Sequence, residues 1–146
     1  MTQHGTDNAV GLILDSSVLI SAERKGLNAR QALGEIALRA AGEEVALSVV
    51  TLVELAQGVA RANTPERRAA RQQFLNETMT ALPVHPVTVP VALRAGRIDG
   101  ENVALGIRLE LSDLLIGATA LELSCRVATA NVRHFQMIPG LAVVSF

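Results

Sequence analysis

Short apolar runs alternate with longer stretches in which apolar residues recur about every three to four positions. The short runs are rich in β-branched residues and predict buried strands over residues 11–14, 44–50, 126–130 and 141–145. Residues 83–89 are also expected to be extended, and the prolines at 83 and 86 favour an edge position because proline cannot donate to the sheet. The alternation therefore predicts several short strands separated by helical segments.

The longer stretches carry one apolar face each, which is typical of helices that cover a sheet. Their ends are marked by helix signals. Thr64-Pro65-Glu66 combines a cap residue, a proline at the first helical position and an acid in the first turn. Helices are expected over about residues 16–24, 27–41, 51–62, 65–80, 91 onward and 113–123, with a turn or short helix over 131–135.

This order of elements predicts an α/β fold. Strands that alternate with helices form a parallel sheet covered by helices on both faces. The chain has 146 residues, about the size of one domain. We expect a flexible N-terminus over residues 1–10 and a single domain over residues 11–146, with ligands bound at the carboxyl ends of the strands.

Four polar side chains fall at that edge of the predicted sheet. Asp15 follows the first strand inside an otherwise apolar run, and Glu54 lies in the first turn of the helix after the second strand. Asp113 opens the helix before the fourth strand, and Asn131 follows that strand. Because the carboxyl ends of parallel strands meet at one edge, we expect these four side chains to lie close together.

Carboxylates that share a site repel one another, and one would take up a proton unless a counter-charge is present. Mg²⁺ prefers oxygen ligands, and such a site can polarise a phosphodiester and lower the pKa of a bound water. Asp15, Glu54 and Asp113 therefore indicate a divalent-cation site suited to phosphodiester hydrolysis. The number of metal ions stays open.

Each of these residues also has a local explanation. Thr51 and Glu54 have the spacing of a capping box, and Asp113 is favoured by the positive end of its helix. Asn131 is a common turn residue, and Asp15 is a common helix cap. The placement of all four at one edge favours a shared site over four separate explanations.

Four successive segments of the chain form a recognisable series: LILDSSVLI at residues 12–20, SVVTLVELAQG at 48–58, DLLIGATAL at 113–121, and ATANVRHF at 128–135 followed by IPGL at 138–141. In this order they resemble the motifs of PIN-domain ribonucleases, in particular VapC-type toxins of bacterial type II toxin–antitoxin pairs. The resemblance implies a PIN-like three-layer α/β/α sandwich with a central, mostly parallel sheet of four to five strands. It also implies Mg²⁺- or Mn²⁺-dependent hydrolysis of RNA, a homodimer, and a VapB-type antitoxin as partner.

The resemblance assigns roles by position. Asp15, Glu54 and Asp113 correspond to the metal-binding catalytic acids, and Asn131 to a fourth catalytic position that is often Asp in the family. Asn131 keeps an oxygen but lacks the charge, so a second metal would be held more weakly. Ser16 stands where the family often has a hydroxyl that orients the first Asp or a water.

Three further positions are left with two interpretations each. His134, where many family members have another acid, is either a surface histidine or a phosphate contact. Asp99 is either a helix-surface acid or a support for the other acids. A basic stretch is either a solvated face or a set of contacts that position RNA phosphates; its members are Arg61, Arg67, Arg68 and Arg71.

Composition narrows the class of function. The formal net charge is −1, so tight binding of nucleic acid without regard to sequence has little support. Trp and Tyr are absent and there are three Phe, so stacking of bases on aromatic side chains has little support either. Cys125 is the only cysteine, which excludes an intramolecular disulfide and a zinc cluster and suits a reducing compartment. The polar first residues and the lack of an apolar run of about 20 residues predict a cytoplasmic protein that does not enter membranes.

Other functions remain open from the sequence. Asn131 leaves room for a PIN-like domain that has lost catalysis and acts as a binding or scaffold module. Cleavage of DNA rather than RNA is a variant of the same chemistry. A small α/β enzyme of another class lacks support, because there is no glycine-rich phosphate loop, no G-x-S-x-G and no paired histidines for zinc.

Overall fold

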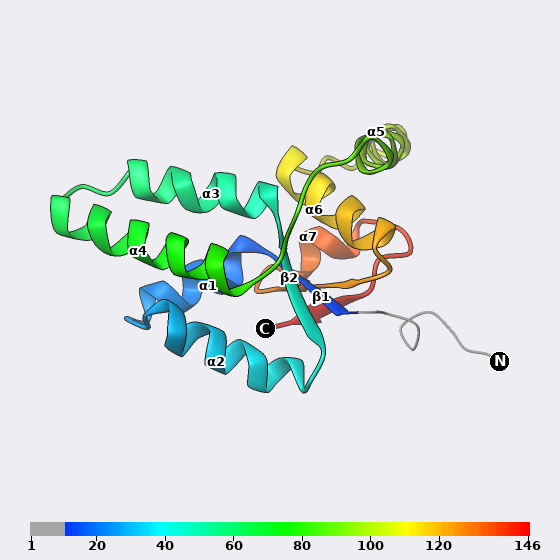
Figure 1. Ribbon diagram of the computed structural model, residues 1–146. Helices are drawn as coiled ribbons and strands as arrows, with labels where there is room; N and C mark the ends of the chain where they lie inside the picture. Colours follow the sequence, from blue (N-terminus) through cyan, green and yellow to red (C-terminus); the bar gives the residue numbers. More distant parts are fainter. Residues whose placement is uncertain (1–10) are drawn as a thin grey trace.

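The computed structural model describes residues 11–146, so the expected flexible N-terminus over residues 1–10 lies outside the described residues. Within the described part, five strands form one sheet in the order β3-β2-β1-β4-β5, and all four pairings are parallel. Figure 1 shows the sheet between two groups of helices. The strands are β1 (Gly11–Leu14), β2 (Glu44–Ser48), β3 (Val84–His85), β4 (Arg126–Thr129) and β5 (Val143–Ser145).

Seven helices lie within the same described residues. They are α1 (Ser16–Arg24), α2 (Ala29–Ala40), α3 (Val49–Ala60), α4 (Pro65–Ala81), α5 (Val89–Ala104), α6 (Leu111–Glu122) and α7 (Val132–Gln136). No helix in this part of the chain is both long enough and apolar enough to cross a membrane.

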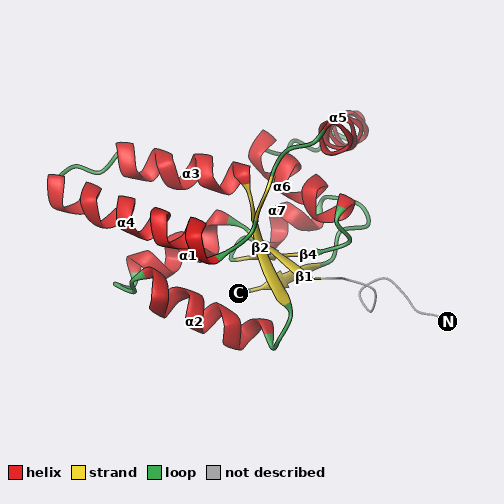
Figure 2. Cartoon of the chain, in the orientation of Figure 1, coloured by secondary structure: helices red, strands yellow, loops and turns green. Residues whose placement is uncertain are grey.

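The central strands bury alternate side chains on opposite faces of the sheet. Helices cover both of these faces (Figure 2). On one face Leu12, Leu14 and Leu47 pack with residues of α1, α2 and α4. On the other face Ile13 and Val127 pack with residues of α5, α6 and α7. The predicted three-layer α/β/α sandwich around a parallel sheet is confirmed.

Three helices begin two residues earlier than their sequence signals predicted, namely α3, α5 and α6; the last begins at Leu111 rather than at residue 113. The helix expected from residue 51 begins at Val49, because the Ser48 hydroxyl caps it by accepting a hydrogen bond from the Val50 amide at 3.1 Å. The helix expected from residue 91 begins at Val89, with Thr88 as its cap. In α3 and α5 a hydroxyl just upstream satisfies an amide that the helix leaves unpaired.

Gly11 begins the central strand, and a methyl group has no room there. A Cβ at this position would lie 2.5 Å from the carbonyl oxygen of Glu44, its partner residue on β2. Gly11→Ala should therefore lower the free energy of unfolding by about 1–3 kcal/mol, because backbone of a buried sheet must move.

Chemical denaturation measures this loss, and Gly100→Ala is the matched control. Gly100 lies within α5, and a Cβ there meets no atom within 4 Å. Alanine favours a helix over glycine by up to about 1 kcal/mol, so this control should be neutral or stabilising. Equal effects of the two substitutions would contradict the crowding at Gly11.

Candidate active site

The carboxyl ends of β1, β2 and β4 place the predicted acids at one edge of the sheet. Asp15 follows β1, which lies between the other two strands, and Glu54 lies in the second turn of α3 beyond β2. Asp113 lies in the first turn of α6. The charge of Asp15 raises the pKa of both Glu54 and Asp113, so the three acids lie within electrostatic range of one another.

Asp15 is only 4 % exposed, and two hydroxyl groups hold its carboxylate. Ser17 Oγ donates to Asp15 Oδ2 at 2.6 Å, and Thr129 Oγ1 donates to the same oxygen at 2.9 Å. Among residues 11–146, no hydrogen-bond donor contacts the other oxygen, Oδ1. The network therefore satisfies one oxygen of a buried carboxylate with hydrogen bonds and leaves the other oxygen for a ligand.

Backbone amides orient these two hydroxyl groups. The amide of Ala130 donates to Ser17 Oγ at 3.0 Å, and the amide of Asn131 donates to Thr129 Oγ1 at 2.8 Å. Each hydroxyl oxygen thus accepts a bond from the β4–α7 turn, which favours turning its own proton toward Asp15. Ser17 and Thr129 are not among the site residues predicted from the sequence; the only signal was a hydroxyl two residues after Asp15 and another two residues before Asn131.

The Ser16 side chain forms a hydrogen bond with Glu54 rather than with Asp15. Its Oγ donates to Glu54 Oε1 at 2.9 Å, across 38 positions of sequence. The capping box considered for Thr51 and Glu54 does not form, because Thr51 lies inside α3 and its hydroxyl donates to the carbonyl of Leu14 at 3.2 Å. Helix capping therefore does not explain the presence of Glu54 at this edge of the sheet.

The side chains of Asp113 and His134 are in contact. His134 Nδ1 lies 3.4 Å from Asp113 Oδ2; the histidine side chain is more than half exposed, whereas the Asp113 side chain is largely covered. His134, expected to be a surface residue or a phosphate contact, thus lies at the rim beside one of the acids. Its protonated form would offset part of the negative charge there.

Burial raises the pKa of Glu54, and the charges of Asp15, Asp113 and Glu110 raise it further, while the hydrogen bond from Ser16 opposes this. Burial likewise raises the pKa of Asp113, and the charges of Asp15 and Glu110 add to the effect, against His134, which lowers it. In the folded protein the charged forms of both carboxylates are therefore disfavoured, by desolvation and by repulsion from the neighbouring acids.

The metal-free protein should lose stability as pH rises above the ordinary carboxyl range. Because the folded-state pKa values of Glu54 and Asp113 lie above their ordinary values of 4.5 and 3.8, the folded state binds more protons than the unfolded state between the two sets of values. The contribution of these groups to stability thus falls through that window and stays low above it. Thermal unfolding in a chelator at successive pH values tests this, and an Asp113→Asn variant with the wild-type pH dependence would contradict it.

The donor chemistry of the site suits a hard divalent cation. Its ionisable donors are carboxylates, the charge of Asp15 raises the pKa of both Glu54 and Asp113, and a cation would relieve this repulsion. Within residues 11–146, no three His, Cys, Asp or Glu side chains are already grouped closely enough to enclose a metal. Mg²⁺ is usually held by one or two carboxylates together with waters and phosphate oxygens, so a partial cage fits it.

Asn131 lies two residues beyond the end of β4 and directly before α7. Its backbone amide takes part in the Thr129 contact, which ties this residue to the Asp15 network. Its side chain makes no hydrogen bond to another residue of the described chain. Asn131 therefore enters the site through its backbone, and its side-chain role remains a prediction.

Three of the four arginines proposed to contact RNA bind their own chain. Arg71 Nη1 donates to the carbonyl of Gly58 at 2.7 Å, and Arg68 Nη2 donates to the carbonyl of Ala62 at 3.2 Å. Arg67 Nη1 donates to Asn63 Oδ1 at 2.9 Å. These bonds fasten α4 to the end of α3 and the loop after it.

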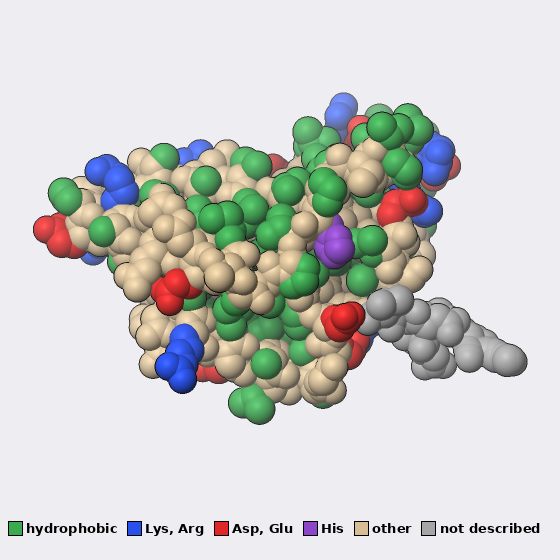
Figure 3. Space-filling model, viewed as in Figure 1, with side chains coloured by type: hydrophobic (Ala, Val, Ile, Leu, Met, Phe, Trp, Pro, Cys, Tyr) green, Lys and Arg blue, Asp and Glu red, His purple; other side chains and the backbone are tan. Residues whose placement is uncertain are grey.

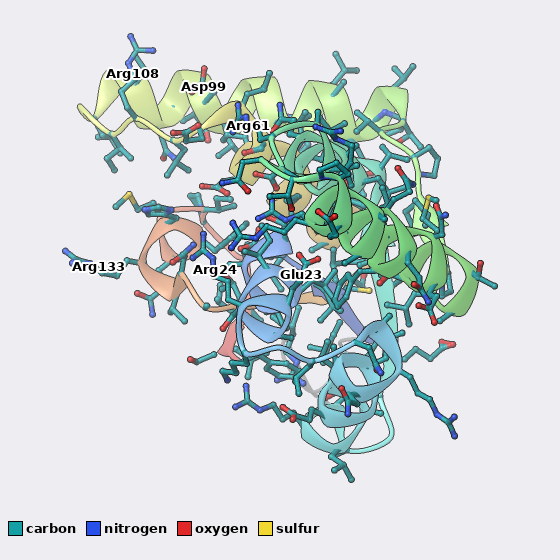
Figure 4. All side chains as sticks on the ribbon, turned by 90° about the vertical axis from the view of Figure 1, so that its left-hand side faces the viewer. Glu23, Arg24, Arg61, Asp99, Arg108 and Arg133 are labelled. Atoms are coloured by element: carbon teal, nitrogen blue, oxygen red, sulfur yellow. The ribbon has the colours of Figure 1, made fainter. Side chains whose placement is uncertain are left out.

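Asp99 lies on α5, and its carboxylate points away from the helices beneath α5 in Figure 4. It is not among the charges that act on Glu54 or Asp113. Its placement favours the interpretation as a helix-surface acid.

The model of the PIN domain family matches residues 12–140 of this chain. A curated relative, ribonuclease VapC10 of Mycobacterium tuberculosis, is 35 % identical over 130 residues, which cover 89 % of this chain and 90 % of that protein.

Solved structures share the fold of this chain. VapBC2 from Rickettsia felis, bound to a DNA fragment from its promoter, aligns with a TM-score of 0.79 and 21 % identity, covering 92 % of this chain and 98 % of that one. VapBC-5 from Mycobacterium tuberculosis, a toxin–antitoxin system, aligns with a TM-score of 0.70 and 28 % identity over 94 % of this chain and 98 % of that one.

Proposed function

Because this chain belongs to the PIN-domain family and to its VapC ribonucleases, we propose that it hydrolyses RNA phosphodiester bonds as the toxin of a VapBC-type pair. The observation that carries this proposal is the buried Asp15 carboxylate. One of its oxygens is held by two hydroxyl groups, and its charge acts on Glu54 and Asp113.

The proposal assigns Asp15, Glu54 and Asp113 to a Mg²⁺ or Mn²⁺ ion. When bound, such a cation lowers the pKa of a coordinated water and polarises the phosphodiester. Ser17 and Thr129 hold Asp15 with one oxygen presented to the site, and Ser16 holds Glu54. These hydroxyl groups keep the carboxylates in place without adding charge.

Asn131 completes the proposed catalytic set as an oxygen donor without charge. A second cation beside Asn131 would face one fewer negative charge than beside an aspartate, and its binding would be weaker. His134 at the rim can place a positive charge near a substrate phosphate when protonated.

The proposed partners are a VapB-type antitoxin and a second copy of this chain, acting in the cytoplasm where RNA is the substrate. The aligned structure of VapBC-5 is that of a member of the VapBC family of toxin–antitoxin systems. Figure 3 shows hydrophobic side chains gathered over α5. Large apolar side chains there and nearby are more than half exposed and could serve a dimer contact: Val89, Leu93, Leu105 and Leu111.

The test compares cleavage of a single-stranded RNA with cleavage of a DNA strand of the same sequence. The purified chain is expected to cut RNA when Mg²⁺ or Mn²⁺ is present and to stop when a chelator removes the metal. Preference for DNA would redirect the proposal to a deoxyribonuclease, and cleavage unaffected by the chelator would overturn the metal assignment.

The alternative is a PIN-like binding module without catalysis, and the uncharged Asn131 is the feature that favours it. Titration calorimetry with Mn²⁺ separates the two functions. A site in which all three acids bind metal should give a measurable heat of binding. No heat of binding at millimolar Mn²⁺ would favour the binding module.

A further inference from the structure

A groove of about 500 Å³ opens between α1, α3 and α4, with Glu54 of the acid site in its wall. We propose that this basic groove holds the RNA backbone next to the scissile bond, and that Arg24 and Arg61 contact its phosphates. This inference rests on the proposed ribonuclease function. The charged side chains of the basic groove are Glu23, Arg24, Glu54, Arg61, Arg67 and Arg71.

The charges of the basic groove favour a polyanion. Four arginines line it against two acids, and one of those acids, Glu23, lies close enough to Arg71 for the arginine to lower its pKa against the larger effect of burial. The apolar lining residues Leu55 and Phe74 are themselves buried, at 6 % and 5 % exposure. The four arginines and two acids leave the groove with an excess of positive charge, which suits the phosphates of a polyanion.

The arginines of the basic groove fall into two groups. Arg71 and Arg67 already donate to the chain, so they help to build the groove wall. Within residues 11–146, the side chains of Arg24 and Arg61 make no hydrogen bond and no ion pair, and both are exposed. An arginine fork without a partner is the group that binds phosphate most readily.

Arg24 and Arg61 lie at the ends of two helices that also connect to the acids. Arg24 lies in the last turn of α1, which begins beside Asp15, and Arg61 directly follows α3, which carries Glu54. Figure 4 views the molecule toward these helix ends and shows both side chains there, with Glu23 beside Arg24. Seven residues of helix separate Glu54 from Arg61, a rise of about 10 Å, so a short single strand can reach from the arginines to the acids.

The experiment measures binding without cleavage, in the Asp15→Asn background, with a short labelled single-stranded RNA of mixed sequence. Fluorescence anisotropy at a series of salt concentrations gives the affinity and its salt dependence. Arg24→Gln with Arg61→Gln should weaken binding by about tenfold at low salt. It should also reduce the slope of log affinity against log salt by about 1.4, since each phosphate contact with a single strand contributes about 0.7.

Arg97→Gln is the matched control, because Arg97 is an exposed arginine of α5 that does not line the basic groove. It should leave the slope unchanged. In the background with Asp15 intact, the double substitution should raise KM for RNA far more than it lowers kcat, since neither arginine lies among the acids.

The outcomes separate this inference from the function on which it rests. If the wild-type chain cleaves RNA and the double variant keeps the wild-type slope and KM, the basic groove does not hold RNA. If RNA binding is unchanged but co-purification with a co-expressed antitoxin is lost, the groove is a protein-binding surface and the inference is overturned. Failure of the wild-type chain to cleave RNA with Mn²⁺ counts against the ribonuclease alone, because the salt slope is measured on binding.

Discussion

Replacing Asp15 with asparagine is expected to reduce RNA cleavage by about a thousandfold or more. A metal ion stabilises the charge of a phosphodiester transition state by several kcal/mol, and a loss of about 4 kcal/mol corresponds to that factor. Asparagine keeps the size of the side chain but removes the charge that attracts the cation. Initial rates on a single-stranded RNA at saturating Mn²⁺ measure the loss.

The fold should survive this substitution. Asp15 is buried, and its charge raises the pKa of both Glu54 and Asp113, so removing it relieves repulsion in the metal-free protein. Thermal unfolding in a chelator should show wild-type or higher stability. Asp99→Asn, on α5 and away from the acids, is the control that should keep full activity, and an Asp15→Asn variant that cleaves at the wild-type rate would refute the assignment.

Removing both hydroxyl groups that hold Asp15, in a Ser17→Ala and Thr129→Val double variant, is expected to reduce cleavage or metal affinity by about 10- to 100-fold. Both hydroxyls donate to Asp15 Oδ2, at 2.6 and 2.9 Å. Without them the carboxylate is free to turn, and it must also bear the cost of burial without its donors. A titration of activity against Mn²⁺ should show a higher metal requirement.

A conservative variant separates the hydroxyl from the packing at this position. Thr129→Ser keeps the donor and should retain most of the activity, whereas Thr129→Val keeps the shape and should show part of the loss of the double variant. Thr80→Val is the matched control, because the Thr80 hydroxyl bonds only to a carbonyl of its own helix on the exposed side of α4. Equal losses in Thr129→Ser and Thr129→Val would show that packing rather than the hydrogen bond matters.

The order of elements and the location of the acids could be predicted because both follow from local periodicity. Leu12 and Leu14 alternate with Ile13 across the sheet, and the helical segments each carry one apolar face. Once the strands are parallel, their carboxyl ends must share an edge, so Asp15 and the residues after β4 have to meet there.

The roles of individual hydroxyl and guanidinium groups could not be predicted in this way. Two adjacent serines follow Asp15, and only the turn into α1 decides that Ser16 contacts Glu54 while Ser17 contacts Asp15. Likewise, a basic run along α4 gives no indication that Arg71 reaches back to the carbonyl of Gly58. A side chain's partner depends on neighbouring elements that are distant in sequence.

The amino-acid sequence by itself determined the layers, the parallel sheet and the edge at which the acids gather, because hydrophobic periodicity and strand direction are enough for these. Only the tertiary structure decided how Asp15 is held. Pairing of β1 with β4 aligns Leu14 with Ala128, which places Thr129 beside Asp15 although 114 positions separate them. Such a contact depends on register and side-chain direction, and these exist only once the sheet has formed.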